Sequence, residues 1–511
     1  MHDPNHAILT KILATIGPAS ATQETVTRLI EEGVRAFRIN FSHGDFDSFD
    51  HALSLIRAAS EQLDIPVGVL GDLCGPKIRL GKLDAGGFDI KTGDRVEFTT
   101  EALIGHRDTE SNLVVLSTNY PVFVEEVDVG QRVLIDDGAV RLLAIDRIDA
   151  EDGPRLHCRV TEGGRISNGK GVNLPDSDIS APSVTDYDKK CIDWAIRREL
   201  DYLALSFVRK AQDVQDLLDL MKDRGRDNVT RFSTTRLPVI AKLETPQAID
   251  QLEDIIEVSD GVMVARGDLG VEMDLPRVPV IQKQIIESCH RLGKPVIVAT
   301  QMLQSMIEHA TPTRAEVSDV ANAICDGADA VMLSGETAVG RFPVQAVYVM
   351  KQTAVMTERF VAEQPMAYGL RDTALRGSKY RTAALARAVK VIVEDIHPNC
   401  VVMWSELGGG ARYLAHSRMT VPIIAVSSNL QALRQMTLLF GVIPMHMERP
   451  AGTSEFVDAV DKMFRTHGWG EAGDPVVFVK GQPIGVPGVT NQVQVHYLGD
   501  VCKFEDQPGR E

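Results

Sequence analysis

Charged side chains stand at the ends of two neighbouring apolar runs near the middle of the chain. The run that begins at Val239 ends in Lys242 and Glu244, and the run Gly261–Ala265 is followed by Asp268. Alternate residues of a strand face the same way, so the lysine and the glutamate point together, about 6–7 Å apart. The apolar residues between the two runs recur at helical spacing, which predicts strand, helix, strand.

Two carboxylates and a lysine at the ends of adjacent parallel strands are typical of a Mg²⁺ site with a fixed cation beside it. Magnesium takes one or two protein carboxylates and completes its shell with water and substrate oxygens. A neighbouring ammonium neutralises charge on a transferring phosphoryl group. The alternative interpretation is a Lys242–Glu244 pair on a solvated strand face, followed by an Arg-Gly-Asp turn without function.

The composition favours a cytoplasmic globular enzyme of two to four domains. The chain has 511 residues, 44% of them hydrophobic and 24% charged, and a net charge of −17. This charge argues against general binding to nucleic acid or to an anionic membrane, which both need a broad basic surface. The N-terminus has no signal-peptide pattern, and no apolar run is long enough to span a bilayer. Seven scattered cysteines without CxxC spacing predict reduced thiols.

Strand-like runs alternate with segments of helical periodicity, such as 24–32, 45–63, 187–200, 278–292 and 314–326. Eight such runs predict a (β/α)₈ TIM barrel, in which chemistry belongs at the C-terminal strand ends. The predicted barrel strands are residues 11–17, 36–42, 67–73, 202–207, 238–244, 261–267, 295–301 and 329–336.

Two regions depart from this alternation. Residues 75–174 contain short Val-, Asp- and Gly-rich runs with frequent turn signals, which predict an all-β domain inserted after the third barrel strand. Such a domain beside the barrel mouth would serve as a lid that excludes water. Residues 356–511 predict a separate C-terminal α/β domain. The barrel would then comprise residues 1–74 and 175–355.

The C-terminal ends of the predicted strands carry a polar set that a purely structural barrel does not require. Together they predict a ring of cations, carboxylates and hydroxyls around one mouth. The set comprises Arg38, Asn40, Ser42, His43, Asp72, Lys77, Arg79, Ser206, Lys242, Glu244, Arg266, Gly267, Asp268, Thr300, Gln301, Ser334 and Glu336.

Many separate motifs along almost the whole chain resemble those of the pyruvate kinase family, in the family's order. The resemblance implies a barrel, an inserted β lid, a C-terminal α/β domain and a homotetramer. The motifs are FRINFSHGD, GDLCGPKIR, DDGAV, KGVNLP, LSFVRKAQDV, AKLETPQ, VMVARGDLGVE, KPVIVATQML, PTRAEVSDVANAICDGADAVMLSGETAVGRFP and GVPGVTN.

The resemblance implies phosphoryl transfer from phosphoenolpyruvate to ADP, giving pyruvate and ATP. Glu244 and Asp268 would hold Mg²⁺, or Mn²⁺ in its place, and Lys242 would stabilise the transferring phosphoryl group. The implied roles of the other residues fall into four sets. Arg38 and Ser206 would hold the phosphate, and Gly267, Asp268 and Thr300 would hold the rest of the substrate. The nucleotide would be bound by Asn40, His43, Arg79 and Lys170. Thr300, Ser334 and Glu336 would surround the proton relay to the enolate.

Several positions depart from the family pattern. Asn40, Ser42, Asp72 and the carbonyl of Leu73 resemble a monovalent-cation site, but Lys77 stands where potassium-dependent members carry Glu. A lysine ammonium supplies the same charge, so we expect no potassium requirement; the alternative is that Lys77 points to solvent and potassium still activates. In addition, Cys74 stands where similar bacterial sequences have Gln, and Ser405–Ala411 lacks the hydroxyl-rich loop of members activated by fructose bisphosphate.

Two other classes of function remain open on the sequence alone. One is another barrel enzyme that uses Mg²⁺-bound enolpyruvate, such as an aldolase or mutase, which would fail to use ADP. The other is a non-catalytic regulatory paralogue, in which we would expect Lys242, Glu244 or Asp268 to be missing. All three residues are present.

Overall fold

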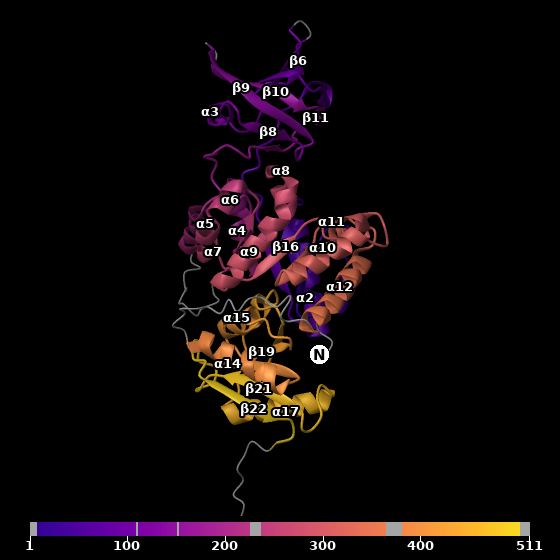
Figure 1. Ribbon diagram of the computed structural model, residues 1–511, viewed down its shortest axis with the longest axis vertical. Coiled ribbons are helices and arrows are strands. Elements are labelled where there is room, and N and C mark those ends of the chain that lie inside the picture. Colours follow the sequence, from indigo (N-terminus) through magenta and orange to yellow (C-terminus); the bar gives the residue numbers. More distant parts are fainter. Residues whose placement is uncertain (1–7, 109–110, 151–152, 225–236, 364–380, 501–511) are drawn as a thin grey trace, which may run out of the picture.

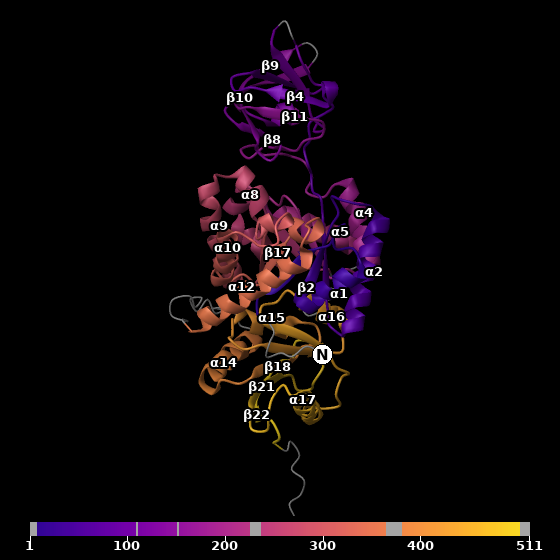
Figure 2. The same ribbon diagram turned by 90° about the vertical axis from the view of Figure 1, so that its right-hand side faces the viewer.

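The computed structural model describes residues 8–108, 111–150, 153–224, 237–363 and 381–500. Three bodies follow one another along its longest axis: a β domain, a barrel and an α/β domain (Figures 1 and 2). The predicted fold class is confirmed. Among the described helices, none combines the length and apolar character that a membrane span requires.

Eight parallel strands close into a barrel in the order β1-β17-β16-β15-β14-β13-β3-β2. All eight predicted strands are present, each shortened at its C-terminal end, where polar residues turn into the mouth. The strands are β1 (Lys11–Thr15), β2 (Val34–Asn40), β3 (Gly68–Asp72), β13 (Tyr202–Leu205), β14 (Val239–Leu243), β15 (Gly261–Ala265), β16 (Val296–Ala299) and β17 (Ala330–Leu333).

Helices surround the barrel and bury their apolar faces against its strands. Side chains of Thr22, Asp45, Thr185 and Thr313 cap four of them, which explains why these helices begin where they do. The helices of this domain are α1 (Gln23–Glu32), α2 (Phe46–Leu63), α4 (Asp186–Arg197), α5 (Ala211–Asp223), α6 (Pro246–Asp250), α7 (Leu252–Val258), α8 (Arg266–Glu272), η3 (Leu275–Arg277), α9 (Val278–Leu292), η4 (Gln304–Ile307), α10 (Arg314–Cys325), α11 (Gly335–Ala338) and α12 (Pro343–Glu363).

The β domain is inserted between β3 and β13 and stands over the barrel (Figure 1). It has a seven-stranded sheet, β12-β8-β9-β10-β5-β7-β6, a two-stranded sheet, β11-β4, and its own apolar core. Its elements are η2 (Asp84–Gly86), β4 (Gly87–Ile90), β5 (Arg95–Thr99), β6 (His106–Arg107), β7 (Leu113–Ser117), α3 (Phe123–Glu126), β8 (Arg132–Ile135), β9 (Val140–Ala150), β10 (Gly153–Glu162), β11 (Gly164–Ser167) and β12 (Val172–Asn173).

The C-terminal domain is built on a five-stranded sheet in the order β20-β19-β18-β21-β22, with only β22 antiparallel to its neighbour. Apolar clusters lie on both faces of this sheet. Its elements are α14 (Arg381–Ile396), β18 (Cys400–Trp404), α15 (Gly409–His416), β19 (Ile423–Ser427), α16 (Leu430–Gln435), β20 (Val442–His446), α17 (Thr453–His467), β21 (Pro475–Lys480) and β22 (Gln492–Tyr497).

The expected start of the C-terminal domain at residue 356 falls inside α12, which is continuous to Glu363. This helix contributes Ala346, Val347, Met350 and Ala354 to the barrel core. We therefore propose that the barrel domain extends to the end of α12. Sequence periodicity did not predict this boundary, because the apolar pattern of a helix does not show which domain's core the helix packs against.

Candidate active site

Strained backbone marks the barrel mouth. Beyond the ends of β13 and β16, Phe207, Thr300 and Gln301 adopt positive φ angles of 53°, 69° and 56°. Residues other than glycine rarely adopt this conformation, and its cost is tolerated most often where a site requires a particular geometry. The strain therefore lies at the strand ends where the sequence predicts chemistry.

Lys242, on β14, lies at the centre of a buried polar cluster. Its Nζ donates to Ser206 Oγ at 2.8 Å and lies 2.9 Å from Glu244 Oε1 and 3.4 Å from Asp72 Oδ1. Arg38 Nε, on β2, pairs with the other oxygen of Asp72 at 2.6 Å. Four strands, β2, β3, β13 and β14, thus bring together residues that lie far apart in the sequence.

The cluster keeps its lysine charged. Burial disfavours the ammonium, but the carboxylates of Asp72 and Glu244 outweigh this effect and raise the pKa of Lys242. Burial also opposes the charge of Asp72, yet Lys242 and Arg38 hold the pKa of this carboxyl below its ordinary value. Two permanent cations therefore face the mouth in a desolvated setting, where charges act strongly on a bound anion.

A second carboxylate group lies close to Glu244. Glu244 is fully buried, and its Oε2 accepts a hydrogen bond from the backbone N–H of Phe207 at 2.8 Å. Burial raises the pKa of Glu244, and the nearby charge of Asp268 adds to this effect while Lys242 opposes it. Asp268 lies in the first turn of α8 and lines the adjacent cleft. A cation between the two carboxylates would relieve their repulsion.

Gly267 and Thr300 contact each other directly. The backbone N–H of Gly267 donates to Thr300 Oγ1 at 2.7 Å. A Cβ atom on Gly267 would lie only 3.3 Å from the same oxygen. The glycine therefore permits α8 to begin close against the end of β16, with a hydroxyl and a helix N-terminus side by side.

Arg266 does not join the predicted ring of cations at the mouth. Its side chain is buried, and its guanidinium pairs with Asp319 at 2.7 Å and donates to the carbonyl of Thr300 at 2.8 Å. The Arg-Gly-Asp segment begins helix α8 and does not continue the strand. The prediction was wrong because the strand was expected to continue to residue 267, whereas it ends at Ala265.

Ser334 and Glu336 lie on the far side of Thr300 from Lys242 along the barrel order. Glu336 is fully buried and accepts from the backbone N–H groups of Ser334 at 2.7 Å and Leu303 at 3.0 Å. Its carboxylate therefore fixes two loops. Among the described residues, Ser334 Oγ is a buried hydroxyl without a hydrogen-bond partner, which leaves it available to a ligand or to water.

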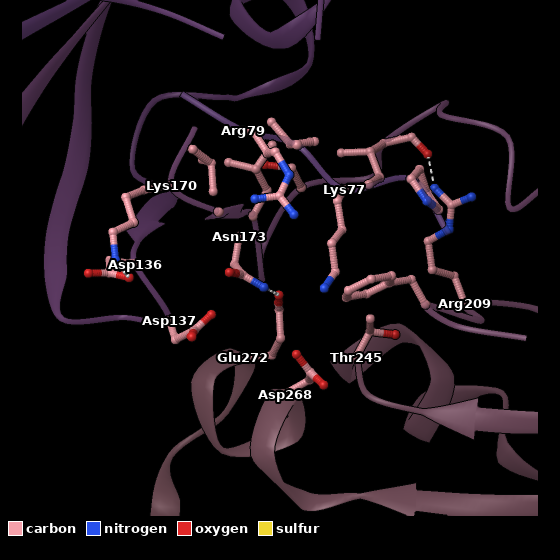
Figure 3. A pocket seen from close by; sticks show the side chains of 18 of the residues that line it. Lys77, Arg79, Asp136, Asp137, Lys170, Asn173, Arg209, Thr245, Asp268 and Glu272 are labelled. Carbon is pink, nitrogen blue, oxygen red and sulfur yellow. Dashed lines mark hydrogen bonds and ion pairs between the residues drawn. The ribbon is translucent and has the colours of Figure 1, made fainter. Parts of the chain in front are cut away.

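The cleft between the lid and the barrel brings two of the predicted nucleotide residues together (Figure 3). Arg79 donates to the carbonyl of Gly169 at 2.8 Å, and Lys170 pairs with Asp136 at 2.8 Å. Both cations line the cleft with Asp268. The structure thus places two cations of the lid opposite a carboxylate of the barrel.

The remaining predicted residues lie at the ends of β2 and β3 or directly after them. Asn40 Oδ1 accepts from the backbone N–H of Ser42 at 3.1 Å, and the backbone N–H of His43 donates to the carbonyl of Asn40 at 3.2 Å. The His43 side chain is exposed and is not among the residues that line the lid cleft. The carbonyl of Leu73 accepts from Ser206 Oγ at 2.7 Å.

Lys77 lies in the cleft, directed toward the side where Asp268 and Glu272 stand (Figure 3). The described contacts do not join it to Asn40, Ser42 or Asp72. Cys74, three residues before it, is half-buried, and burial raises the pKa of its thiol. Less thiolate at neutral pH disfavours alkylation of this cysteine.

Sequence reasoning missed one contact between lid and barrel. Asn173, at the end of the lid strand β12, donates through Nδ2 to Glu272 Oε1 at 2.7 Å (Figure 3). Burial raises the pKa of Glu272 to about 7. A signal was present, because Glu272 follows Asp268 by four residues and a helix places such residues on one face.

Glu244 and Asp268 are the two carboxylates at the mouth that could hold a metal. Within the described ranges, no group of three or more His, Cys, Asp or Glu side chains is arranged to hold a metal. Glu244 Oε1 makes no hydrogen bond of regular geometry, although it faces Lys242. Two oxygen donors suit Mg²⁺, which commonly takes most of its ligands from water and substrate.

Comparison with known proteins agrees with this geometry. Residues 8–347 match the family model "Pyruvate kinase, barrel domain", and residues 383–496 match "Pyruvate kinase, alpha/beta domain". The chain is 39% identical to a pyruvate kinase of Mycobacterium tuberculosis over 96% of its own length and 98% of the relative's. It is 40% identical to "Pyruvate kinase 2" of Synechocystis, over 96% of its own length and 79% of the relative's.

A solved structure of a pyruvate kinase from Cryptosporidium parvum superposes with a TM-score of 0.87 at 31% identity, covering 97% of each chain. The structural similarity between the two chains extends over the barrel, the lid and the C-terminal domain together. The alternatives of an aldolase, a mutase or a non-catalytic paralogue are not favoured. The chain belongs to the pyruvate kinase family of phosphotransferases, which generally use Mg²⁺ and act on phosphoenolpyruvate and ADP.

Proposed function

We propose that the cluster around Lys242 binds the phosphoryl group of phosphoenolpyruvate and stabilises it during transfer to ADP. The observation that carries this proposal is a buried ammonium held charged by Asp72 and Glu244 while it donates to Ser206. Arg38, fixed by Asp72, supplies a second cation on the same side. Preorganised charges of this kind stabilise a phosphoryl transition state without reorganisation during the reaction.

Glu244 and Asp268 are the residues that would hold Mg²⁺, with Mn²⁺ as an alternative ion. The bound metal would neutralise substrate charge and orient the phosphoryl and carboxylate oxygens. The fit rests on the burial and the nearby charge of Asp268, which both raise the pKa of Glu244, and on the Glu244 oxygen without a regular hydrogen bond. Gly267 and Thr300 then bind the carboxylate side of the substrate, beside Asp268 in the first turn of α8.

The proton that converts the enolate to pyruvate would pass near Thr300 and Ser334. Thr300 Oγ1 already accepts from Gly267, and Ser334 Oγ is buried and unpaired in the described part of the chain. Glu336 bonds two backbone N–H groups, so we assign it to positioning Ser334. The donor would be a water molecule whose proton is relayed through these two side chains.

Arg79 and Lys170 would bind the phosphates of ADP from the lid, with Asn40 contributing from the end of β2 and His43 from the loop after it. Support comes from the two lid cations that line the cleft opposite Asp268. In the described conformation, each cation is held by a neighbour, Arg79 by Gly169 and Lys170 by Asp136. A nucleotide would exchange these contacts for its phosphate oxygens.

We also propose that Lys77 replaces the monovalent cation, so that potassium is not required. Lys77 faces the cleft, and the residues of the cation-like set already have partners, Asp72 with Arg38 and Lys242, and the Leu73 carbonyl with Ser206. A titration of KCl at constant ionic strength checks this. Strong activation by potassium would contradict the role of Lys77 and leave the reaction unchanged.

The first test of the reaction is pyruvate formation from phosphoenolpyruvate and ADP with Mg²⁺, in sodium or Tris buffer and again with potassium. We expect turnover in all of these buffers, and no turnover after removal of Mg²⁺ by a chelator. Failure to use ADP under every condition would overturn the proposed function. A homotetramer is our further proposal, checked by light scattering on the purified chain.

A further inference from the structure

A second cavity lies at the opposite end of the barrel from the mouth. Its volume is about 410 Å³, and it is lined from the barrel by residues of β1, β2 and α2 and from the C-terminal domain by α16 and β20. The C-terminal domain meets this end of the barrel, far from the lid (Figure 2). No residue proposed for phosphoryl transfer lines this cavity.

Five Lys and Arg side chains line this cavity, and three of them have carboxylate partners. Arg57 and Arg434 share the buried Asp201 at 2.9 and 2.7 Å, and Lys351 lies 3.4 Å from Glu32. These pairs neutralise much of the positive charge, and the carboxylates of Glu61 and Asp64 also line the cavity. What distinguishes the cavity is the remaining two cations.

Lys11 and Arg35 are bound by carbonyl groups only. Lys11 Nζ lies 3.4 Å from the carbonyl of Ile8, and Arg35 Nη1 donates to the carbonyls of Ile30 and Val34, both at 2.9 Å. Over the described ranges, neither side chain has a carboxylate within ion-pair distance. Carbonyl groups orient a cation, but they leave its charge uncompensated.

The positive charges of Lys11 and Arg35 repel each other. Lys11 is only 3% exposed, and burial lowers its pKa to about 7, with the charge of Arg35 adding to the effect and Glu358 opposing it. Burial also lowers the pKa of Arg35 to about 10. Glu358 directs its oxygens to the backbone N–H groups of Leu9 and Thr10, at 3.0 and 2.6 Å. Glu358 thus compensates Lys11 only in part, and two desolvated cations without a carboxylate bound directly to either are costly unless an anion joins them.

We propose that this cavity is a binding site for a phosphate group, held between the Lys11 ammonium and the Arg35 guanidinium. Two cations match the double negative charge of a phosphate, whereas a carboxylate would neutralise only one. A guanidinium presents paired N–H donors that fit phosphate oxygens, and an ammonium adds a point charge. Bound there, the anion would remove the repulsion between the two side chains.

The cavity also has room for more than the phosphate. Its volume of about 410 Å³ is many times the roughly 30 Å³ that a water molecule occupies in the liquid. A phosphomonoester would therefore fit with its organic part against Ile443 and Pro444 of β20, which also line the cavity. Such a ligand would contact the barrel and the C-terminal domain at once.

The test compares the wild type with Lys11→Met and Arg35→Gln by melting temperature at constant ionic strength. Inorganic phosphate and glycerol phosphate are the probes, with glycerol as the uncharged comparison and Lys222→Met, an exposed lysine of α5, as the control variant. We expect both phosphates to stabilise the wild type and the control. We expect half-maximal stabilisation in the two cavity variants at phosphate concentrations at least about tenfold higher, the loss of one charge-assisted contact.

Equal phosphate stabilisation of the wild type and both cavity variants would overturn the proposal, as would equal stabilisation by glycerol. A larger effect of glycerol phosphate than of inorganic phosphate would support a phosphomonoester, and equal effects would support free phosphate. If Lys11→Met does not fold, Arg35→Gln alone decides. Neither residue lies at the mouth, so pyruvate formation without added phosphate should stay within about twofold of the wild type, which separates this test from that of the reaction.

Discussion

At the scale of single residues, the two ends of the barrel use buried lysines in opposite ways. Lys242 is surrounded by Asp72 and Glu244, which raise its pKa and keep it charged. Lys11 lies beside Arg35, and burial lowers its pKa to about 7. The difference arises from neighbours, since both side chains are buried. A permanent cation suits phosphoryl transfer, whereas a destabilised one suits binding of an added anion.

Replacing Lys242 by Met should lower kcat by about 10²–10³, because one preorganised charge-stabilising group is typically worth about 3–4 kcal/mol in the transition state. The protein should remain folded, since the methionine fills similar space. Steady-state kinetics and circular dichroism measure the two effects. The control Lys222→Met should retain full activity, and a loss below tenfold in Lys242→Met would contradict the assignment.

Replacing Lys11 by Met should raise the melting temperature in phosphate-free buffer, more at pH 6 than at pH 9. Below the folded-state pKa of about 7, Lys11 is charged in the folded and unfolded states, and the whole cost of burial is present. Between about pH 7 and pH 10.5 the unfolded state still binds the proton that the folded state has released. The stability of the wild type therefore rises with pH over this range, and the stabilisation gained by the substitution becomes smaller. A gain independent of pH would exclude a titrating Lys11.

At the scale of elements, helix α8 links the substrate site to the lid. Its first turn carries Asp268, and one turn later Glu272 accepts from Asn173 of β12. The segment after β12 is also bound, because Gln247 of α6 donates to the carbonyls of Pro175 and Ser177 at 3.3 and 3.2 Å. The lid is therefore attached beside the residue proposed to bind the metal.

Replacing Asn173 by Ala should raise the KM for ADP several-fold and change the KM for phosphoenolpyruvate less. The substitution removes one hydrogen bond to a buried carboxylate, worth about 1.5–3 kcal/mol, and loosens the lid that carries Arg79 and Lys170. Initial-rate kinetics with each substrate varied in turn measure the effect. Gln212→Ala, on the exposed face of α5, is the control. An equal rise in both KM values would argue against a role in nucleotide binding.

At the scale of the whole molecule, polar contacts join the C-terminal domain to the lower end of the barrel. Arg418, after α15, reaches Asp329 at 3.0 Å and the carbonyl of Ala328 at 3.1 Å, and its guanidinium lies 3.5 Å from the centre of the Phe440 ring. Tyr202, on β13, donates to the carbonyl of Gln435 at 2.6 Å. These contacts fix the C-terminal domain against the barrel.

Replacing Arg418 by Met should destabilise the protein, because Asp329 would keep a buried charge without its partner, at a cost of roughly 3–5 kcal/mol. Adding Asp329→Asn should restore part of the loss, since the charge is then removed as well. Thermal or denaturant unfolding of the two variants measures both changes. If the double variant were no more stable than Arg418→Met, the ion pair would not be the source of the effect.

Much of this architecture could be predicted from local pattern. The run from Val278 to Leu292 forms helix α9 with the predicted bounds, and each of the eight apolar runs forms a barrel strand. The ends of the strands were predicted less accurately: the strand predicted over residues 261–267 placed Arg266 at the mouth, whereas the strand ends at Ala265 and a helix begins at Arg266. The periodicity of apolar residues shows which face of a helix or strand is apolar. It does not show the residue at which backbone hydrogen bonding changes from sheet to helix.

The sequence by itself determined the fold class, the family and the residue types at the mouth, because hydrophobic period and motif order are local properties of the chain. Only the tertiary structure decided which of these residues meet. It paired Arg38 and Lys242 with Asp72, turned Arg266 inward and brought Asn173 to Glu272. It also left Lys11 and Arg35 together at the cavity below the barrel. Distance, burial and charge compensation depend on contacts between distant segments, and no local pattern encodes them.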